Sequence, residues 1–580
     1  MILYTKLRSN IRLNDDVELA KRELTTMFDE VRAIASPLYF QKACIPPNNT
    51  RLSSPLGFTC RGPKVPLENI LHSLNFVQEV WVKKDDPILG ERLNGHRGYV
   101  TGNYVLFVPF MAFAELLEKT RNGQLLEAKQ DSLAAFLAGD TAEISTLYHN
   151  AVNLQASSTQ HVHGLHKYKA KFFPRFVRSQ IVTHIVDVPS NSLGEKTILD
   201  PFVGSGTALV EASILGYRSF GLDIDKLSCA ISKAKLDILN LEYDVTFSHL
   251  RETEQLLRSF TGVSSHEARE SYRFPSVMAQ KFRRWTAQTE QHRYEQEISS
   301  LMDFISNISN PSLRSLVRIS LSDALCKKFN VRMMGTGSGR FALEIAKTEL
   351  PSLFAENLQN LRKILFSVAT LKKRFGISPA PSEVHTGNAK VMPFSDSQMS
   401  LVVTSPPYLP ASSGRENYLV GKAISMTALN LVTEKELDAI DANSVGSIRA
   451  FDAEDDGRLP QGVYDLVRWL ENDPLRSIKA RPVLNYYLDL KQSLLETMRV
   501  LVPGGVAIYI IGKTSTFYNA KTRDIVYQVK CDDIFRELAT SIGFKVSEKT
   551  DIELDKKNKN ARPRSLDAFF ESAFALKKTE

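Results

Sequence analysis

Cysteine is scarce in this sequence, and the cysteines present form no recognisable site. The five residues are far apart and include no Cys-x-x-Cys pair; they are Cys44, Cys60, Cys229, Cys326 and Cys531. Zinc sites and disulfide frameworks usually show closely and regularly spaced cysteines. The sequence therefore predicts reduced thiols and no metal site built from cysteine.

Long hydrophobic runs are also missing. No window approaches the roughly 18 consecutive apolar residues that a membrane-spanning helix needs, and Lys6, Arg8 and Arg12 interrupt the first residues before an apolar run can form. A signal peptide requires such a run behind its charged start. We expect a cytoplasmic protein with no membrane partner.

The sequence otherwise has the composition of a globular protein. Its 580 residues are 43% hydrophobic and 24% charged, which allows more than one structural unit with a sizeable core. The formal charge of +8, with an isoelectric point near 9.0, favours a polyanionic partner because Lys and Arg neutralise phosphates. Spread over this length, the charge only suggests such a partner, so function has to be sought in local motifs.

Two regions differ in pattern. Residues 1–155 mix a helical stretch, VELAKRELTTMFDEVRAI, with strand-like runs such as VQEVWV and GYVTGNYVLFVPF, which predicts a separate α+β domain. A polar stretch ending near Thr159 serves as the boundary. Residues 156–580 would form the second domain.

The second region alternates short apolar strands with amphipathic helices from Thr197 onward. The expected strands are TILD, SFGLD, EVHT, SLVVT, VAIYII, FKVSEK and ESAFALK. This alternation is typical of an α/β fold with a doubly wound, mostly parallel sheet. The gap at about 246–380 is too long for a loop and predicts a mainly helical insert.

A glycine-rich turn follows the first of these strands in TILDPFVGSGTALVEASILG. No Lys-Ser or Lys-Thr follows Gly206, so it is not a P-loop, and Val210 stands near the third glycine of a dinucleotide fingerprint. Asp200 ends this strand, and Asp223 ends the next, where an acid can accept hydrogen bonds from ribose hydroxyls. The alternative is that Asp223 caps the helix that begins near Asp225.

A second motif, Ser405-Pro406-Pro407-Tyr408, directly follows the apolar strand SLVVT. Ligands of open α/β sheets gather at the carboxyl ends of strands, and two prolines stiffen the loop. Alone, such a tetrapeptide is more often an ordinary proline turn. Its position downstream of DPFVGSGT favours a functional loop.

With both motifs in place, the chain resembles the amino-methyltransferases of DNA, which modify cytosine N4 or adenine N6. That family has a DPFxGSGT cofactor loop and an upstream motif like HGLHKYKAKFFPRF, and NYYLDLKQSLLETMRVLVPGGVAIYIIGK resembles the fifth helix and strand of class I methyltransferases. The resemblance implies a Rossmann-like class I methyltransferase fold and S-adenosyl-L-methionine as cofactor. It covers about 161–245 and 381–580.

The resemblance also assigns residues to the site. Those expected around the cofactor are Lys171, Phe172, Pro174, Asp200, Phe202, Gly204, Gly206, Thr207, Asp223 and Asn388. The Ser405 hydroxyl and the Pro406 carbonyl would accept hydrogen bonds from a base amine, and Tyr408 would stack on the flipped base. His161, His163 and His166 lack a cysteine or acidic partner at ligand spacing, so no metal is predicted.

The target base and the biological setting are less constrained. In the family Ser at position 405 favours cytosine N4 in double-stranded DNA, with adenine N6 as the alternative; RNA guanine N2 and an inactive nucleic-acid-binding homologue are further alternatives. A restriction-modification system with a cognate restriction endonuclease is the implied setting. The first candidate for reading DNA is the insert, with Lys281, Arg283, Arg284, Trp285, Lys327, Lys328, Arg332 and Arg340, and the second is the basic loop 556–565. For both, the alternative is an ordinary solvated surface.

Overall fold

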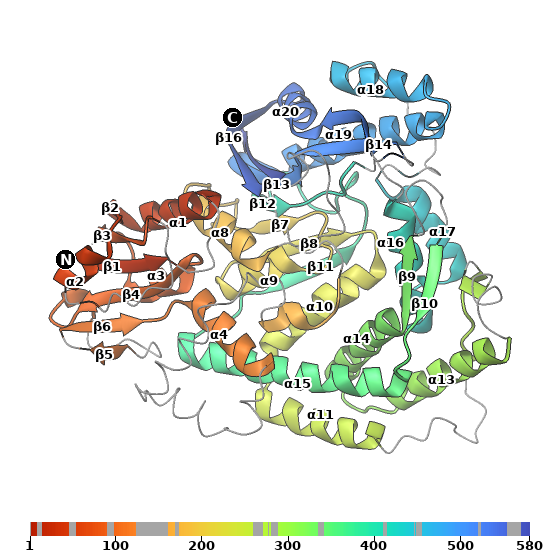
Figure 1. Cartoon of the computed structure of the whole chain (residues 1–580), viewed down its shortest axis with the longest axis horizontal. Helices are drawn as coiled ribbons and strands as arrows, with labels where there is room; N and C mark the ends of the chain where they lie inside the picture. Colours follow the sequence, from red (N-terminus) through yellow and green to blue (C-terminus); the bar gives the residue numbers. More distant parts are fainter. Residues whose placement is uncertain are drawn as a thin grey trace.

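The computed structural model places two large sheets beside each other, with helices between and around them (Figure 1). It describes residues 2–7, 14–43, 45, 54–89, 98–101, 103–122, 161–168, 173–258, 271–276, 278–279, 288–333, 341–409, 414–445, 447, 455–519, 522, 524–553 and 570–579. Within these ranges no helix is long and apolar enough to cross a membrane.

The N-terminal region folds around a six-stranded antiparallel sheet in the order β2-β3-β1-β4-β6-β5. Its strands are β1 (Leu3–Leu7), β2 (Phe28–Ile34), β3 (Gly57–Pro63), β4 (Val77–Lys83), β5 (Tyr99–Thr101) and β6 (Tyr104–Phe107). Its helices are α1 (Asn14–Met27), α2 (Pro37–Lys42), the short η1 (Pro87–Leu89), α3 (Leu67–Ser73) and α4 (Phe110–Asn122). This is the α+β architecture predicted for the region.

One predicted helix in this region is only half right. The stretch VELAKRELTTMFDEVRAI is helical as far as Met27, and the remaining residues form strand β2. Phe28 and Ile34, at the two ends of β2, are buried, and the strand pairs with β3 from Phe28 opposite Pro63 to Ile34 opposite Gly57. Pairing with a distant strand overrides the local helical periodicity.

The second region contains a seven-stranded sheet in the order β11-β8-β7-β12-β13-β17-β16. All seven strands expected from the sequence are present, as β7 (Ile198–Asp200), β8 (Ser219–Asp223), β11 (Ser382–Thr386), β12 (Met399–Thr404), β13 (Leu501–Gly512), β16 (Phe544–Glu553) and β17 (Phe570–Lys578). The pairs from β11 to β13 are parallel, and β17 runs antiparallel to both neighbours. The predicted class I methyltransferase fold is confirmed.

Helices cover both faces of this sheet, because its central strands are apolar on both sides. In β12, Leu401 and Val403 join the core formed with α8 (Pro174–Ile185), α9 (Thr207–Ile214) and α10 (Lys226–Asn240). Val402 points to the opposite face and joins the core formed with α18 (Gln461–Glu471), α19 (Ala480–Val500) and α20 (Cys531–Ile542). The sheet is therefore doubly wound.

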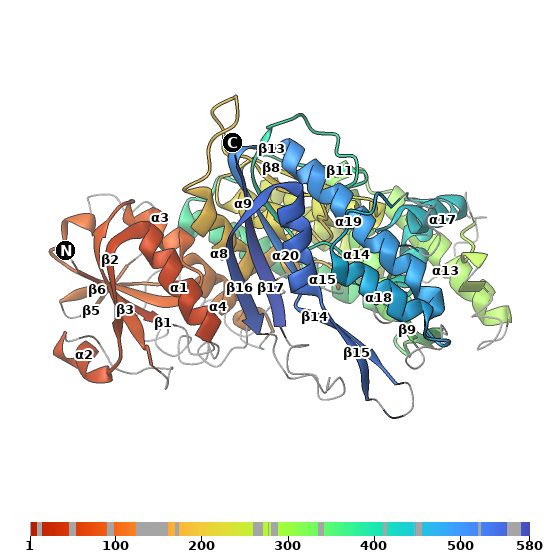
Figure 2. The same ribbon diagram turned by 90° about the horizontal axis from the view of Figure 1, so that it is seen from above.

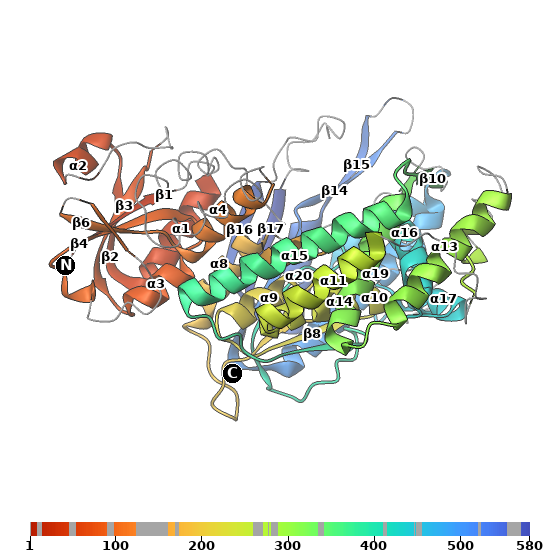
Figure 3. The ribbon, with the colours of Figure 1, turned by 90° about the horizontal axis from the view of Figure 1, so that it is seen from below.

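The segment between β8 and β11 is mainly helical, as predicted. Beyond α10 it contains α11 (Tyr243–Arg258), α13 (Gln288–Ser306), α14 (Pro311–Lys328), the hairpin β9 (Phe329–Met333) and β10 (Phe341–Ile345), and α15 (Leu350–Phe375). The long helix α15 packs against α11 and α14 and also reaches α4 of the N-terminal region (Figure 3). The insert thus braces one side of the molecule.

The long segment after β12 adds further helices and a projecting hairpin. It contains α16 (Gly414–Ala428), α17 (Glu434–Asn443), α18, the short η3 (Ser477–Lys479) and α19. The hairpin of β14 (Thr514–Tyr518) and β15 (Ile525–Lys530) follows β13 and points away from the body of the protein (Figure 2).

Candidate active site

The glycine-rich turn joins β7 to α9 at the carboxyl edge of the central sheet. Gly204 and Gly206 have φ angles of +48° and +79°, a region that L side chains avoid. A Cβ atom on Gly206 would lie 2.8 Å from Ser232 Oγ, and one on Gly204 would lie 3.3 Å from the Tyr168 hydroxyl. Both positions require glycine because the backbone is left-handed and closely packed.

Three side chains outside the turn fix its backbone. The Gly204 N–H donates to Asp223 Oδ2 at 2.9 Å, and Ser232 Oγ donates to the Gly204 carbonyl at 2.9 Å. The Lys235 ammonium, fully buried in α10, donates to the Ser205 carbonyl at 2.6 Å. The turn is held rigid before any ligand binds.

Asp223 lies where the sequence analysis predicts, at the end of β8, and it is not the helix cap. Asp225 caps α10, accepting hydrogen bonds from the Leu227 and Ser228 N–H groups, and Asp223 Oδ1 accepts one from the Asp225 N–H at 2.9 Å. The capping alternative therefore belongs to Asp225. Asp223 stays half-buried at the strand end, where a carboxylate can accept further hydrogen bonds.

The two acids of the site have unusual electrostatics. Burial raises the pKa of Asp200 to about 7, although hydrogen bonds from Thr404 and the Phe202 N–H oppose the rise. Burial and the charge of Asp225 raise the pKa of Asp223 to about 6. Hydroxyl donors and positive charge near these carboxylates would relieve the cost of burying them. The ribose hydroxyls and the cationic sulfonium of S-adenosylmethionine have these properties, so the residues fit that cofactor.

A single hydrogen bond joins the two predicted motifs. The Thr404 hydroxyl, at the end of β12, donates to Asp200 Oδ1 at 2.6 Å. Strands β7 and β12 are parallel neighbours, with Leu401 opposite Ile198 and Val402 opposite Leu199. The DPFVGSGT turn and the Ser405–Tyr408 loop therefore leave the same sheet edge side by side.

The loop from Ser405 to Tyr408, called the SPPY loop below, is anchored from two further elements. The Tyr486 hydroxyl of α19 donates to the Pro407 carbonyl at 3.0 Å, and the Ser515 hydroxyl of β14 donates to the Leu409 carbonyl at 3.2 Å. Pro406 is buried and Ser405 half-buried. Hydrogen bonds from α19 and β14 therefore hold the loop, which is not an isolated proline turn.

Contacts with Gly512 and Glu571 fix the position of the Tyr408 side chain. Its side chain is 39% exposed, and a Cβ on Gly512 would lie only 3.4 Å from Tyr408 Cδ2, so the ring packs against the Gly512 backbone. The Tyr408 hydroxyl donates to Glu571 Oε1 at 2.7 Å. Partial burial of the ring, together with the charge of Glu571, raises the pKa of Tyr408 well above its usual value.

The other predicted cofactor residues divide between described and undescribed positions. Phe202 is half-buried in the turn, Thr207 begins α9, and Pro174 begins α8. Asn388 is half-buried just beyond β11, and its side-chain oxygen accepts from the Lys390 N–H at 3.0 Å. Lys171 and Phe172 lie outside the described residues.

Two residues that the sequence analysis did not select, Tyr168 and Lys422, lie beside the glycine-rich turn. Tyr168 hydrogen-bonds Ser228 Oγ at 2.9 Å, and the Lys422 ammonium of α16 lies 4.5 Å from the centre of the Tyr168 ring and donates to Asp225. Tyr168 belongs to HKYKAKFF and could have been chosen from that motif. Lys422 gave no sequence signal, because α16 folds back from a distant segment.

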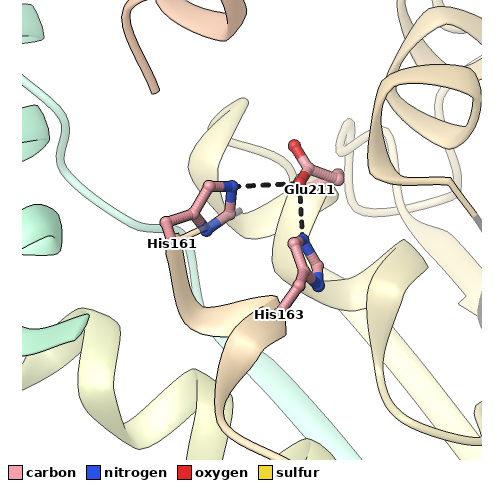
Figure 4. Close-up of side chains that lie close together, drawn as sticks. All are labelled: His161, His163 and Glu211. Atoms are coloured by element: carbon pink, nitrogen blue, oxygen red, sulfur yellow. Dashed lines mark hydrogen bonds and ion pairs between the residues drawn. The ribbon is translucent and has the colours of Figure 1, made fainter. Parts of the chain in front are cut away.

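A buried cluster ties the cofactor-loop helix α9 to its surroundings (Figure 4). His163 Nε2 lies 2.8 Å and His161 Nε2 3.5 Å from Glu211 Oε1, while Arg178 donates to Glu211 Oε2 at 2.9 Å. Glu211 is an acidic partner that sequence spacing did not reveal, so the reason given against a metal was incomplete. Arg178 already compensates the carboxylate, and the absence of metal stays a prediction.

Charge and burial act together in this cluster. Burial alone would raise the pKa of the Glu211 carboxyl, but hydrogen bonds from His161 and His163 and the charge of Arg178 hold it well below its usual value. Burial lowers the pKa of His163 to about 3, which leaves its ring neutral. The cluster is a compensated ion pair inside the protein.

The structure tests only two of the predicted DNA-reading side chains. Lys327 pairs with Asp323 at 2.8 Å and hydrogen-bonds Asn357, and Lys328 is buried with its ammonium on the Ala346 and Thr348 carbonyls. For Lys328 the prediction is wrong, because its ammonium is used inside the insert. Arg332 belongs to β9, but its side chain is outside the described set, as are Lys281, Arg283, Arg284, Trp285, Arg340 and the loop 556–565.

Comparison with known proteins finds relatives of one kind. The chain is 40% identical over 87 residues to the type II methyltransferase M.MjaII of Methanocaldococcus jannaschii, an alignment covering 15% of this chain and 14% of that protein. It is 22% identical over 400 residues to M.MvaI of Kocuria varians, covering 64% and 81%. It is 24% identical over 312 residues to M.BsoBI of Geobacillus stearothermophilus, covering 51% and 58%. The chain thus spans less than two thirds of two of these relatives.

Family models and solved structures add little to this. No family model matches the chain. A SAM-dependent methyltransferase of Methanosarcina mazei aligns with a TM-score of 0.24 at 9% identity, over 66% of this chain and 93% of that one. The rRNA methyltransferase AviRa of Streptomyces viridochromogenes aligns with a TM-score of 0.26 at 11% identity, over 74% and 95%. The strand order and the sequence relatives together confirm the resemblance, and the chain is similar to the type II methyltransferases.

Proposed function

We propose that this chain is an S-adenosylmethionine-dependent DNA methyltransferase that methylates the exocyclic N4 amine of a flipped cytosine. The observation that carries the proposal is the Thr404–Asp200 hydrogen bond of 2.6 Å, which sets the SPPY loop beside the glycine turn. A cofactor pocket and a set of amine acceptors then share one sheet edge. Similarity to type II methyltransferases supports DNA as the substrate.

The chemistry needs little beyond positioning. An exocyclic amine is a weak nucleophile, because its lone pair is delocalised into the ring of the base. In our proposal the Ser405 hydroxyl and the Pro406 carbonyl accept its hydrogens and favour a tetrahedral nitrogen, aimed at the methyl group that the bound cofactor supplies. The anchors from Tyr486 and Ser515 keep these acceptors in place.

We assign to the remaining residues the roles that the sequence analysis predicts. The half-exposed ring of Tyr408 offers a surface on which a flipped base can stack. In our proposal Asp223 accepts hydrogen bonds from the ribose hydroxyls, Asn388 contacts the adenine and Pro174 flanks the methionine end. Lys171 and Phe172 are assigned to the methionine end by the family resemblance alone. Asp200, Phe202, Gly204, Gly206 and Thr207 wrap the cofactor. We further propose that the enzyme serves a restriction-modification system with a partner endonuclease.

One assay tests the reaction and the base together. The full chain is incubated with randomised duplex DNA and isotopically labelled S-adenosylmethionine, and the DNA is digested and analysed by mass spectrometry. We expect labelled N4-methylcytosine with the native chain and at least about 100-fold less with Ser405→Ala, given the usual cost of losing a positioned polar group. Ser306→Ala, a hydroxyl at the end of α13, is the matched control.

The outcomes separate the parts of the proposal. Labelled N6-methyladenine would keep the reaction and replace the base. A native chain that binds the cofactor but labels no DNA would overturn the methyltransferase assignment. Full activity of Ser405→Ala would remove Ser405 from the mechanism.

A further inference from the structure

Three side chains at the carboxyl edge of the sheet form a directed hydrogen-bond chain. Ser405 Oγ donates to the Tyr408 hydroxyl at 3.4 Å, and the Tyr408 hydroxyl donates to Glu571 Oε1 at 2.7 Å. Each hydroxyl donates onward and can accept from the group before it. The chain starts at the group proposed to hold the base amine and ends at a carboxylate.

Strand direction explains how a residue near the end of the chain reaches this place. Strand β17 runs antiparallel to β13, with Glu571 opposite Gly512, so the start of β17 lies where the parallel strands end. Gly512 has no side chain, and the Tyr408 ring packs over it toward Glu571. Glycine at 512 and glutamate at 571 together define where the Tyr408 hydroxyl lies.

Methylation of an amine releases a proton that must leave the nitrogen. As the nitrogen attacks the methyl carbon, an N–C bond forms and the bond from carbon to the sulfonium sulfur breaks, with that electron pair going to sulfur. The nitrogen then carries a positive charge and one hydrogen too many. A neutral methylated base forms only when that hydrogen passes to an acceptor.

We propose that Ser405, Tyr408 and Glu571 are a proton relay that takes this hydrogen from the base nitrogen to the Glu571 carboxylate. Ser405 receives the proton and passes its own hydrogen to Tyr408, which passes its own to Glu571. One proton leaves the base, and Glu571 becomes neutral. The inference rests on the proposed function and extends it to a residue outside every motif noted in the sequence.

The surroundings of Glu571 suit an acceptor. Burial raises the pKa of Glu571, against the hydrogen bond from Tyr408, so the carboxylate accepts a proton more readily than an exposed one. Of the charged groups beside the flanking strands, Lys513, which directly follows β13, is paired with Asp551 of β16 at 2.8 Å. Tyr486 of α19, whose hydroxyl donates to the Pro407 carbonyl, is a further titratable group beside Tyr408.

The test separates proton acceptance from positioning. In Glu571→Gln the amide oxygen can still accept the hydrogen bond from the Tyr408 hydroxyl, so the ring should keep its position. The amide cannot take up a proton. We expect unchanged KM for DNA and cofactor and a fall of about 100-fold in the single-turnover rate of methyl transfer. The native rate should fall as the pH is lowered and Glu571 is protonated, whereas the variant should lack that titration.

Tyr408→Phe keeps the aromatic ring and breaks the relay, so it should show a similar loss of rate, and the double variant should lose little more. Glu537→Gln, an exposed carboxylate on α20, is the control. A native rate and pH profile in Glu571→Gln, or a raised KM with an unchanged rate, would overturn the relay. A native chain that methylates no DNA would instead overturn the proposed function.

Discussion

Gly206 combines two constraints that a single substitution can separate. Its φ angle is +79°, and an added Cβ would lie 2.8 Å from Ser232 Oγ, whereas Gly216 has a φ of +86° with nothing within 4 Å of the same added atom. Alanine at either position meets a left-handed backbone that costs about 1–2 kcal/mol. Only at Gly206 does the alanine side chain also press on Ser232, whose hydroxyl donates a hydrogen bond to the Gly204 carbonyl.

We therefore expect Gly216→Ala to lose about 1–2 kcal/mol of stability in urea unfolding, and Gly206→Ala to lose at least as much because its Cβ also displaces Ser232. By calorimetric titration, Gly206→Ala should bind S-adenosylmethionine at least about tenfold more weakly, a change of roughly 1.4 kcal/mol. Gly216→Ala should bind it as the native chain does. Equal cofactor affinity in the two variants would mean that the turn tolerates displacement.

At the scale of elements, α8 and α9 are joined through Arg178 and Glu211. Arg178 is fully buried, donates to Glu211 at 2.9 Å and to the His72 carbonyl at 2.7 Å, and stacks on the Phe110 ring at 4.4 Å. His72 and Phe110 belong to α3 and α4 of the N-terminal region. One guanidinium thus links the cofactor-loop helix to the first sheet's helices.

Arg178→Met should destabilise the protein by about 3–5 kcal/mol, because it leaves the Glu211 carboxylate buried without its cation. Adding Glu211→Gln should recover part of that loss, since the charge is then removed as well. Equilibrium urea unfolding measures both, and Arg536→Met, with its exposed side chain on α20, is the control. No loss in Arg178→Met would show that the histidines alone support Glu211.

For the molecule as a whole, buried ionisable groups make stability depend on pH. Burial raises the pKa of Glu23, on α1, from 4.5 to about 7, although hydrogen bonds from Asn75 oppose the rise. The folded state therefore binds a proton more tightly than the unfolded state. Its stabilising contribution is complete below about pH 4.5 and is lost as the pH rises toward 7.

Half-buried His184, whose pKa desolvation lowers to about 4, acts in the opposite direction, so the native chain alone gives no clean slope. The difference between native and Glu23→Gln isolates Glu23. We expect the unfolding free energy of the native chain, relative to the variant, to fall by up to about 1.4 kcal/mol per pH unit between pH 5 and 7. A difference independent of pH would mean that Glu23 is ionised throughout.

The sequence alone was sufficient to predict the central sheet and the two loops at its carboxyl edge. Apolar runs such as SLVVT can be satisfied only by burial on both faces, and glycines at 204 and 206 are required by local backbone geometry. These are short-range constraints, so they can be read along the chain. The fold class, the relationship to methyltransferases and the positions of Asp200, Asp223 and Ser405 followed from them.

Tertiary structure decided which distant residues serve the site. Lys422, Tyr486 and Glu571 reach it only through helix packing and the reversed direction of β17, and Glu211 meets His161 and His163 only after α9 packs beside them. The strand half of VELAKRELTTMFDEVRAI likewise depends on β3, which is distant in sequence. Contacts between residues far apart in sequence arise from packing and burial in three dimensions, and one sequence read by its local patterns does not encode them visibly.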